Sequence, residues 1–354
     1  MSQVRTLEQC NYRIDCFGDN HLYEGDNLEV LRDLAAEPSV KGQVRLVYID
    51  PPFGTGQDFT YSDGRYSTVS RTNGGNSAYT DSLTGQPYLD FLRPRLTLLH
   101  DLLADDGSIY VHIDVKMEHY VKILMDSIFI GNFRSAISRI KGNPKNFQRL
   151  AYCNTKDSIL FYSKGERYVW VQPRIPLTKD DLRRLFPKRD SEGRWYTTTP
   201  LHGPGETKNG PTGRAWKGLA PPAGRHWRYS PDVLTDLDNR GLIEWSSTGN
   251  PRKKLYADDA AKKGKFLQDV WDFKDPQYVR YPTEKNLDML KIIVGASSDP
   301  GDLVMDAFCG SGTALVAAQQ LGRAWLGIDN SKTAIEVSKE RIQEEVPGLQ
   351  WQPG

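Results

Sequence analysis

Two short segments of this chain carry residues that could act together on an amino group, and they lie near its two ends. In the first, Asp50-Pro51-Pro52-Phe53, the Asp50 carboxylate and the Pro51 carbonyl could each accept one hydrogen of an exocyclic amine. Such bonds favour a pyramidal nitrogen whose lone pair faces an electrophilic methyl group. Phe53 offers a face on which a flat base can stack. Because the amine of a paired base is buried in a duplex, this chemistry requires base flipping. The alternative interpretation is a rigid turn at a strand end.

The second segment, Asp306-Ala-Phe-Cys-Gly-Ser-Gly-Thr313, indicates a nucleoside-cofactor site. Gly310 and Gly312 allow close approach of the backbone, and the helix start behind them offers free N–H groups. Asp329 ends the next apolar run, near the ~20-residue offset at which an acid binds ribose hydroxyls. Position 315 is Leu, so the third glycine of a pyrophosphate cradle is missing. This favours a nucleoside without a diphosphate, such as S-adenosylmethionine, over the dinucleotide of a nicotinamide oxidoreductase.

Both segments follow apolar runs that alternate with helical patterns. We expect strands at 45–49, 108–113, 134–140, 158–162, 242–245, 303–305 and 324–328. We expect helices at 88–103, 117–129, 287–293 and 313–321, and a long loop at 54–87. This alternation predicts an α/β, Rossmann-like fold with a doubly wound, mostly parallel sheet. His112 lies within an apolar strand and is predicted to be a satisfied core histidine rather than a ligand.

The middle of the chain differs in composition from the two ends. Residues 134–265 hold 27 Lys and Arg against 13 Asp and Glu, although the whole chain has a net charge of +1. We predict a catalytic half at 1–163, a basic insert at 164–265 and a cofactor-binding half at 266–354. The charge excess favours a phosphate-binding surface over a merely solvated insert.

Basic side chains of this middle span are candidates for reading guanine edges or holding phosphates. They are Lys145, Arg214, Lys217, Arg225, Arg228, Arg252, Lys253 and Lys254. The tryptophans of the insert are expected in its core: Trp195, Trp216, Trp227 and Trp245.

Other classes of protein are disfavoured by the composition. No apolar run approaches the ~20 residues of a membrane span, and the first residues lack the apolar stretch of a signal peptide. The four cysteines form no paired pattern, so we expect neither a metal site nor a disulfide framework, and a reducing cytoplasm fits.

The motifs resemble the β class of DNA amino-methyltransferases, in which the catalytic block precedes target recognition and the cofactor block comes last. The matching segments are Asp50–Phe53, Gly25-Asp26, Tyr281-Pro-Thr-Glu-Lys-Asn286, Asp306–Thr313 and Gly327-Ile-Asp329. Asn154-Thr-Lys-Asp157 departs from the family's Asn-x-His-Glu pattern, so no histidine role is carried over there.

The resemblance implies S-adenosylmethionine as cofactor, with Thr283 and Lys285 meeting its methionine carboxylate. Its other implied cofactor-binding residues are Asp26, Pro282, Asp306, Phe308, Gly310, Ser311, Gly312, Thr313 and Asp329. An Asp at the first motif position, where cytosine-N4 enzymes more often carry Ser, favours adenine N6 in double-stranded DNA. Cytosine N4, an RNA base, and a nucleic-acid-binding protein without catalysis remain alternatives.

The Asp-Pro-Pro-Phe-Gly-Thr-Gly stretch is similar to that of type III modification subunits. The resemblance therefore suggests a prokaryotic, cytoplasmic, DNA-associated enzyme. It also suggests a homodimer and a cognate restriction endonuclease as partners.

Overall fold

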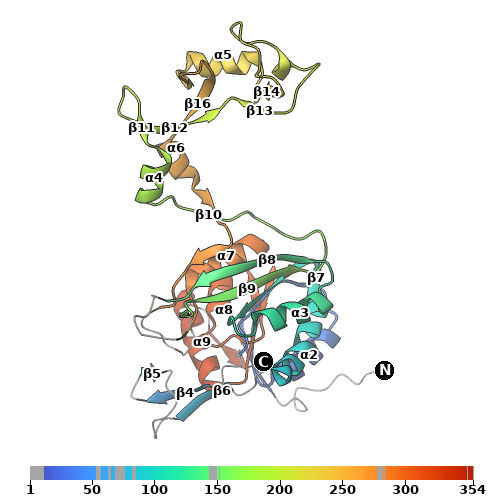
Figure 1. The fold of residues 1–354 in the computed structure, drawn as a ribbon. Helices are drawn as coiled ribbons and strands as arrows, with labels where there is room; N and C mark the ends of the chain where they lie inside the picture. The colour runs from blue at the N-terminus through green and yellow to red at the C-terminus, as the bar shows by residue number, and fades with distance from the viewer. Residues whose placement is uncertain are drawn as a thin grey trace. The chain divides into compact units, whose positions relative to one another are not determined.

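The computed structural model describes residues 12–52, 57–62, 65–67, 76–81, 85–142, 150, 152–276, 281, 284–348 and 350–353. The chain divides into two compact units (Figure 1): a main unit of Met1–Pro173 with Gln268–Gly354, and an inserted unit of Arg174–Leu267. The predicted start of the insert at 164 is therefore wrong by ten residues. Lys164 N donates to the Gly107 carbonyl at 2.9 Å and Val171 N to the Ala296 carbonyl at 2.8 Å, which ties this stretch to the main unit.

A ten-stranded sheet forms the centre of the main unit, in the order β18-β8-β9-β7-β3-β19-β20-β2-β1-β21. Its strands are β18 (Val270–Asp272), β8 (Phe133–Ile140), β9 (Lys156–Ser163), β7 (Leu103–Ile113), β3 (Val44–Ile49), β19 (Leu303–Asp306), β20 (Ala324–Asp329), β2 (Asn20–Glu24), β1 (Arg13–Phe17) and β21 (Gln352–Pro353). The five strands from β7 to β2 run parallel, and antiparallel strands flank them. The predicted doubly wound α/β fold is confirmed.

The sheet order brings the two chemical segments together. β3, which ends one residue before Asp50, pairs in parallel with β19, so that Val47 lies opposite Met305. β19 in turn pairs with β20, which ends at Asp329. In open α/β sheets, ligands bind outside the carboxyl ends of such strands. Three carboxylates from distant parts of the sequence therefore meet at one edge.

Helices cover both faces of this sheet (Figure 1). Helices α1 (Asn27–Ala36), α2 (Gln86–Leu102) and α3 (Glu118–Ile128) pack side by side, as do α7 (Leu287–Ser297), α8 (Thr313–Gln320) and α9 (Lys332–Glu345). Val47 and Ile49 of β3 join the apolar core under α1–α3. Tyr110 of β7 points to the other face, where its hydroxyl bonds Ser297 of α7 at 2.8 Å. Alternation along each strand thus assigns its side chains to one helix layer or the other.

The region predicted as a loop at 54–87 contains a small antiparallel sheet in its described residues. Its strands are β4 (Gln57–Ser62), β5 (Arg65–Ser67) and β6 (Asn76–Asp81). The loop prediction was wrong here because these strands are only 3 to 6 residues long, too short to give a sustained periodic signal in the sequence.

The inserted unit has its own sheets and core. Its four-stranded sheet contains β11 (Lys188–Arg189), β12 (Trp195–Pro200), β16 (Pro251–Tyr256) and β15 (Ile243–Trp245). Two-stranded sheets join β10 (Arg174–Ile175) with β17 (Lys265–Phe266) and β13 (His202–Pro204) with β14 (Arg225–Trp227). The helices are α4 (Lys179–Leu185), the 3-10 turn η2 (Pro211–Gly213), α5 (Pro231–Asn239) and α6 (Ala257–Lys263).

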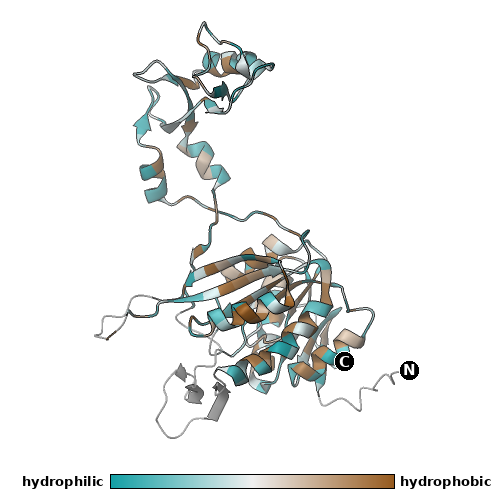
Figure 2. Cartoon of the chain, turned by 45° about the vertical axis from the view of Figure 1, so that its right-hand side comes forward, coloured by the Kyte–Doolittle hydropathy of each residue, from teal (hydrophilic) through white to brown (hydrophobic). Residues whose placement is uncertain are grey.

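Two of the four tryptophans expected in the insert's core are not buried. Trp216 and Trp227 pack in its apolar cluster, whereas Trp195 and Trp245 are each 45% exposed. Hydrophobic colour is concentrated in the main unit's strands, and the inserted unit is mostly hydrophilic (Figure 2). Within the described residues, every helix is too short or too polar to span a bilayer.

Candidate active site

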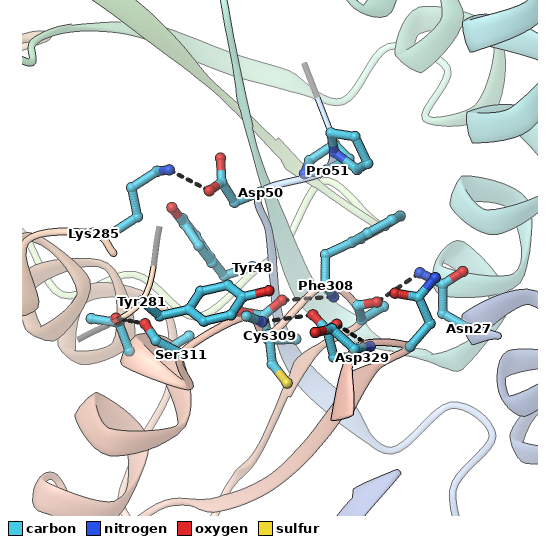
Figure 3. A pocket seen from close by; sticks show the side chains of 18 of the residues that line it. Asn27, Tyr48, Asp50, Pro51, Tyr281, Lys285, Phe308, Cys309, Ser311 and Asp329 are labelled. Carbon is cyan, nitrogen blue, oxygen red and sulfur yellow. Dashed lines mark hydrogen bonds and ion pairs between the residues drawn. The ribbon is translucent and has the colours of Figure 1, made fainter. Parts of the chain in front are cut away.

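A cavity of about 520 Å³ lies at the carboxyl ends of the central strands and is lined by both chemical segments. Its volume is within the range of small-molecule sites. The lining includes the predicted residues Asp26, Asp50, Pro51, Pro52, Lys285, Asp306, Phe308, Gly310, Ser311, Thr313 and Asp329. Phe53, Pro282, Thr283 and Lys145 lie outside the described residues. The structure thus joins segments that the sequence leaves far apart (Figure 3).

Asp50 is held at the rim of the sheet by a cation from the other end of the chain. Its Oδ2 forms an ion pair with Lys285 Nζ, and both side chains are largely buried. Its Oδ1 is buried with no hydrogen-bond partner among the described residues. An unpaired carboxylate oxygen facing a cavity is costly unless a ligand donates to it. Asp50 therefore retains one acceptor for a donor in the cavity.

The glycine turn is built by left-handed backbone and by α9. Gly312 caps α8 at φ +71°, where a Cβ would lie 2.7 Å from Ser338 Oγ of α9. Gly310 has φ +52°, and its N–H donates to Asp329 Oδ2 at 2.9 Å. Asp329 Oδ1 accepts from Ser331 N at 2.9 Å. Only glycine fits at position 312 without displacing α9.

Arg341 of α9 holds this turn through hydrogen bonds from the helix side. No sequence pattern indicated a role for Arg341. Its Nη1 donates to the Ser311 carbonyl and Oγ, each at 2.8 Å, and to Thr313 Oγ1 at 2.9 Å. Its Nη2 pairs with Glu284 at 3.3 Å, immediately before Lys285. One buried guanidinium therefore links the cofactor turn to the segment that reaches Asp50.

A second group of polar residues closes the cavity near α1. Asp26 is the N-cap of α1 and accepts from Leu28 N at 2.7 Å. Arg95 of α2 donates to Asn27 Oδ1 at 2.6 Å and to Asp26 Oδ1 at 3.2 Å. Asn27 Nδ2 donates to the Ala307 carbonyl at 2.8 Å. The sequence did not indicate a role for Arg95, because a single arginine on an amphipathic helix is typical of a solvated surface charge.

Burial alters the protonation of the carboxylates in this site. It raises the pKa of Asp306 well above its ordinary value, and the nearby charges of Asp50 and Asp329 add to the effect. Burial also raises the pKa of Asp329, although backbone N–H groups of Ser331 and Gly310 oppose the shift. Clustered carboxylates of this kind gain most from a cationic or hydroxyl-bearing ligand.

The basic candidates of the inserted unit differ in how they are engaged. Lys217 is ion-paired with Asp238, whereas the described residues give the other six no ion pair. Arg225 Nη1 approaches His202 Nδ1 at 3.3 Å, and Arg228 Nε donates to the His202 carbonyl at 3.3 Å. Burial lowers the pKa of His202, and the neighbouring arginines lower it further. These unpaired guanidinium groups leave positive charge available on the unit.

A family model described as DNA methylase matches residues 44–340, which include both chemical segments. The chain belongs to this DNA methylase family. The type II methyltransferase M.EcaI of Enterobacter cloacae is 43% identical over 330 residues, covering 91% of this chain and 69% of the relative. The StyLTI Mod subunit of a type III restriction-modification enzyme from Salmonella typhimurium is 28% identical over 337 residues. That match covers 85% of this chain and 50% of the subunit, so the chain spans about half its length.

Among solved structures, one titled as the M1.HpyAVI–SAM complex gives a TM-score of 0.49 at 16% identity. It covers 91% of this chain and 98% of the other.

S-adenosylmethionine is the cofactor of this family and therefore of this methylase. The cavity suits it on the chemistry of its lining. Seven aspartates line the cavity against two lysines and one arginine, which favours a ligand carrying a sulfonium and an ammonium group. Gly310 lines the cavity without a side chain, so a nucleoside can approach its backbone closely.

Proposed function

We propose that this DNA methylase transfers a methyl group to adenine N6 at a specific site in double-stranded DNA after flipping the base. The observation that carries the proposal is the single cavity that Asp50 and the glycine turn share. A donor nucleoside and an acceptor amine bound there would lie next to each other.

Asp50 and the Pro51 carbonyl would accept the two amine hydrogens, and Phe53 would stack on the base. S-adenosylmethionine, when bound, supplies an electrophilic methyl group on a sulfonium sulfur. Fixed acceptors favour the pyramidal nitrogen whose lone pair attacks that methyl carbon. Pro52 would keep the segment rigid, because its ring fixes the backbone. The unpaired Oδ1 of Asp50 supports this role.

The cofactor would be held by residues from three parts of the main unit. Asp329 would accept the ribose hydroxyls, and the Gly310–Thr313 turn would lie under the nucleoside. Asp26, Asp306 and Phe308 would line its remaining walls. The methionine carboxylate would meet Lys285 with Pro282 and Thr283, and Lys285 would then exchange its ion pair with Asp50 for that carboxylate.

Adenine is favoured over cytosine because Asp rather than Ser stands at position 50. The inserted unit would recognise the target, with unpaired guanidinium groups such as Arg225 and Arg228 reading base edges or phosphates. The similarity to these methyltransferases of restriction-modification systems supports the same role here, in a prokaryotic cytoplasm. We include a homodimer and a cognate endonuclease as partners in this proposal.

The test incubates purified protein with unmethylated genomic DNA and methyl-labelled S-adenosylmethionine, and then analyses the DNA nucleosides by mass spectrometry. Labelled N6-methyldeoxyadenosine is expected. Labelled N4-methyldeoxycytidine would overturn the choice of base. Unlabelled DNA together with labelled RNA from a parallel incubation with cellular RNA would overturn the choice of nucleic acid. Asp50→Ala should abolish labelling. Asp19→Asn, an exposed carboxylate between β1 and β2, serves as control and should keep full activity.

A further inference from the structure

A chain of buried polar side chains lies against the cavity, with Tyr48 and Asp157 both in the cavity lining. Tyr48 lines the cavity, and its hydroxyl lies 2.8 Å from His112 Nδ1. His112 Nε2 lies 3.0 Å from Asp157 Oδ2, which is also 3.1 Å from Arg139 Nη1. All four side chains are at most 2% exposed. Burying so many polar groups costs free energy that burying apolar side chains would not. Buried polar clusters of this kind are typical of functional sites.

The geometry fixes the tautomer of His112. Asp157 Oδ2 can only accept as a carboxylate, so the ring nitrogen facing it, Nε2, carries a proton. In the neutral ring Nδ1 is then an acceptor, and it takes the hydrogen of the Tyr48 hydroxyl. The phenolic oxygen of Tyr48 keeps its lone pairs for a donor in the cavity.

The inner end of the chain is anchored and charged. Arg139 Nε donates to the Phe273 carbonyl at 2.8 Å, and Nη2 pairs with Asp275. Burial raises the pKa of Asp157, but the charge and hydrogen bond of His112 and the charge of Arg139 outweigh it and bring the pKa to about 2. Asp157 is therefore ionised at neutral pH and can stabilise a positive charge on His112.

The outer end of the chain reaches Asp50. Its unpaired Oδ1 lies 4.0 Å from His112 Nδ1. In Figure 3 the hydroxyl end of Tyr48 lies below the ion pair of Asp50 and Lys285. Burial raises the pKa of Tyr48 well above its ordinary value, and the charge of Asp50 raises it further. Tyr48 therefore stays protonated and can pass a proton only by accepting one while donating another.

We propose that Tyr48 and His112 form the route by which the proton released in methyl transfer leaves Asp50. This inference rests on the proposed function. When the amine nitrogen bonds the methyl carbon, the carbon–sulfur bond breaks with its electron pair on sulfur, and the nitrogen becomes positively charged. One N–H then breaks with its electron pair on nitrogen, and the proton passes to Asp50.

Asp50 Oδ1 has no hydrogen-bond partner among the described residues of the resting structure; once protonated, it donates to the Tyr48 oxygen and gives up that proton while the Tyr48 hydroxyl gives its own to His112 Nδ1. Asp50 and Tyr48 return to their starting states, and the imidazolium is balanced by Asp157. After the product base leaves, the proton returns along the same chain to water entering the cavity. A relay is needed because the bound base and the duplex would cover the Asp50 carboxylate and keep it from bulk water. Among the described residues, the charged or titratable groups that face His112 include Tyr48 and Asp50 of the β3 end, Arg139 of β8 and Asp157 of β9.

The test measures single-turnover methylation of unmethylated genomic DNA by the full chain across pH. Tyr48→Phe keeps the ring and removes the relay, and should lower the rate about ten-fold or more, within the range of general acid–base catalysis. Its affinity for S-adenosylmethionine should stay within about two-fold of wild type. Tyr110→Phe is the matched control, because it loses an equally buried hydroxyl bond, to Ser297 at 2.8 Å, outside the cavity. It should keep the wild-type rate.

The role of His112 has readouts that a merely structural residue would not move. His112→Gln should slow single-turnover methylation by about the same factor as Tyr48→Phe, and the double variant should be no slower than either, because all three changes break the same relay. Nitrogen NMR of the free protein should show His112 protonated at Nε2 alone, with its signal identified by its loss in His112→Gln. A protonated Nδ1 in the neutral ring would overturn the relay.

The outcomes separate this inference from the proposed function. Wild-type activity with an inactive Asp50→Ala and a fully active Tyr48→Phe would overturn the relay alone. Additive rate losses in the double variant, with both single variants folded, would likewise show that His112 has only a structural role. Absence of DNA methylation by the wild type, with the expected tautomer present, would overturn the proposed function.

Discussion

Replacing Arg341 by Met should loosen the cofactor turn and destabilise the main unit together. The guanidinium makes three hydrogen bonds of 2.8–2.9 Å to Ser311 and Thr313 and an ion pair of 3.3 Å with Glu284. Arg341 and Glu284 side chains are only 9% and 11% exposed. Leaving a buried acceptor unsatisfied costs about 1–3 kcal/mol, and breaking a buried ion pair costs about 3–5 kcal/mol.

These contributions share one side chain, so they do not add, and we expect a loss of about 3–5 kcal/mol in the free energy of unfolding. For a unit of this size the melting temperature should fall by roughly 10 °C. Because Ser311 and Thr313 line the cavity in which we propose that the cofactor binds, the dissociation constant of S-adenosylmethionine should rise about ten-fold, equivalent to about 1.4 kcal/mol. Differential scanning fluorimetry and titration calorimetry with S-adenosylmethionine measure the two effects.

Arg240→Met is the matched control. Arg240 pairs with Asp236 on the exposed surface of α5, so its loss should change neither quantity measurably. Arg341→Lys keeps the charge but not the forked geometry and should fall between wild type and Arg341→Met. Wild-type stability together with wild-type cofactor affinity in Arg341→Met would refute the assigned linkage.

Three further substitutions test other parts of the site. Gly312→Ala should weaken cofactor binding and destabilise more than Gly322→Ala, because both have positive φ but only position 312 places a Cβ 2.7 Å from a serine of α9; equal effects in calorimetry and melting would contradict this. Asp157, with a pKa of about 2 against an ordinary 3.8, contributes about 2 kcal/mol that is present above pH ~4 and lost toward pH 2. Asp157→Asn should therefore have a lower free energy of unfolding at neutral pH, and in urea unfolding this free energy should change less between about pH 4 and about pH 2 than in the wild type. An unchanged dependence on pH in that range would contradict the lowered pKa of Asp157. Arg228→Ala should reduce the salt dependence of DNA binding more than Lys217→Ala, since Lys217 is already ion-paired with Asp238. A larger reduction for Lys217→Ala in filter-binding assays would contradict the proposed contact between Arg228 and DNA.

Local chemistry explains what could be predicted from the sequence. Apolar runs ending in Asp50, Asp306 and Asp329 indicated buried parallel strands with polar ends, and the glycines at 310 and 312 indicated a tight turn before a helix. These signals depend only on residues that are neighbours in sequence, so they can be recognised without knowledge of the fold. The structure placed the corresponding residues on one cavity.

Residues that act across the fold could not be predicted in the same way. Arg95 lines the cavity and Arg341 bonds to the glycine turn, each from a helix, and nothing in their local sequence separates them from surface arginines. His112 was correctly predicted to be buried, yet its position between Tyr48 and Asp157 depends on which strands are neighbours.

The order of the strands is the fact that only the tertiary structure decided. The sequence by itself determined the residues suited to gripping an amine and a nucleoside, because motif and strand signals are local. It did not determine that β3 pairs with β19, or that Lys285 reaches Asp50. Those contacts join residues separated by most of the chain, and they form only when apolar strands are buried together between the two helix layers. The residues suited to the chemistry lie in short segments, and their assembly into one site depends on the burial together of strands that are distant in sequence.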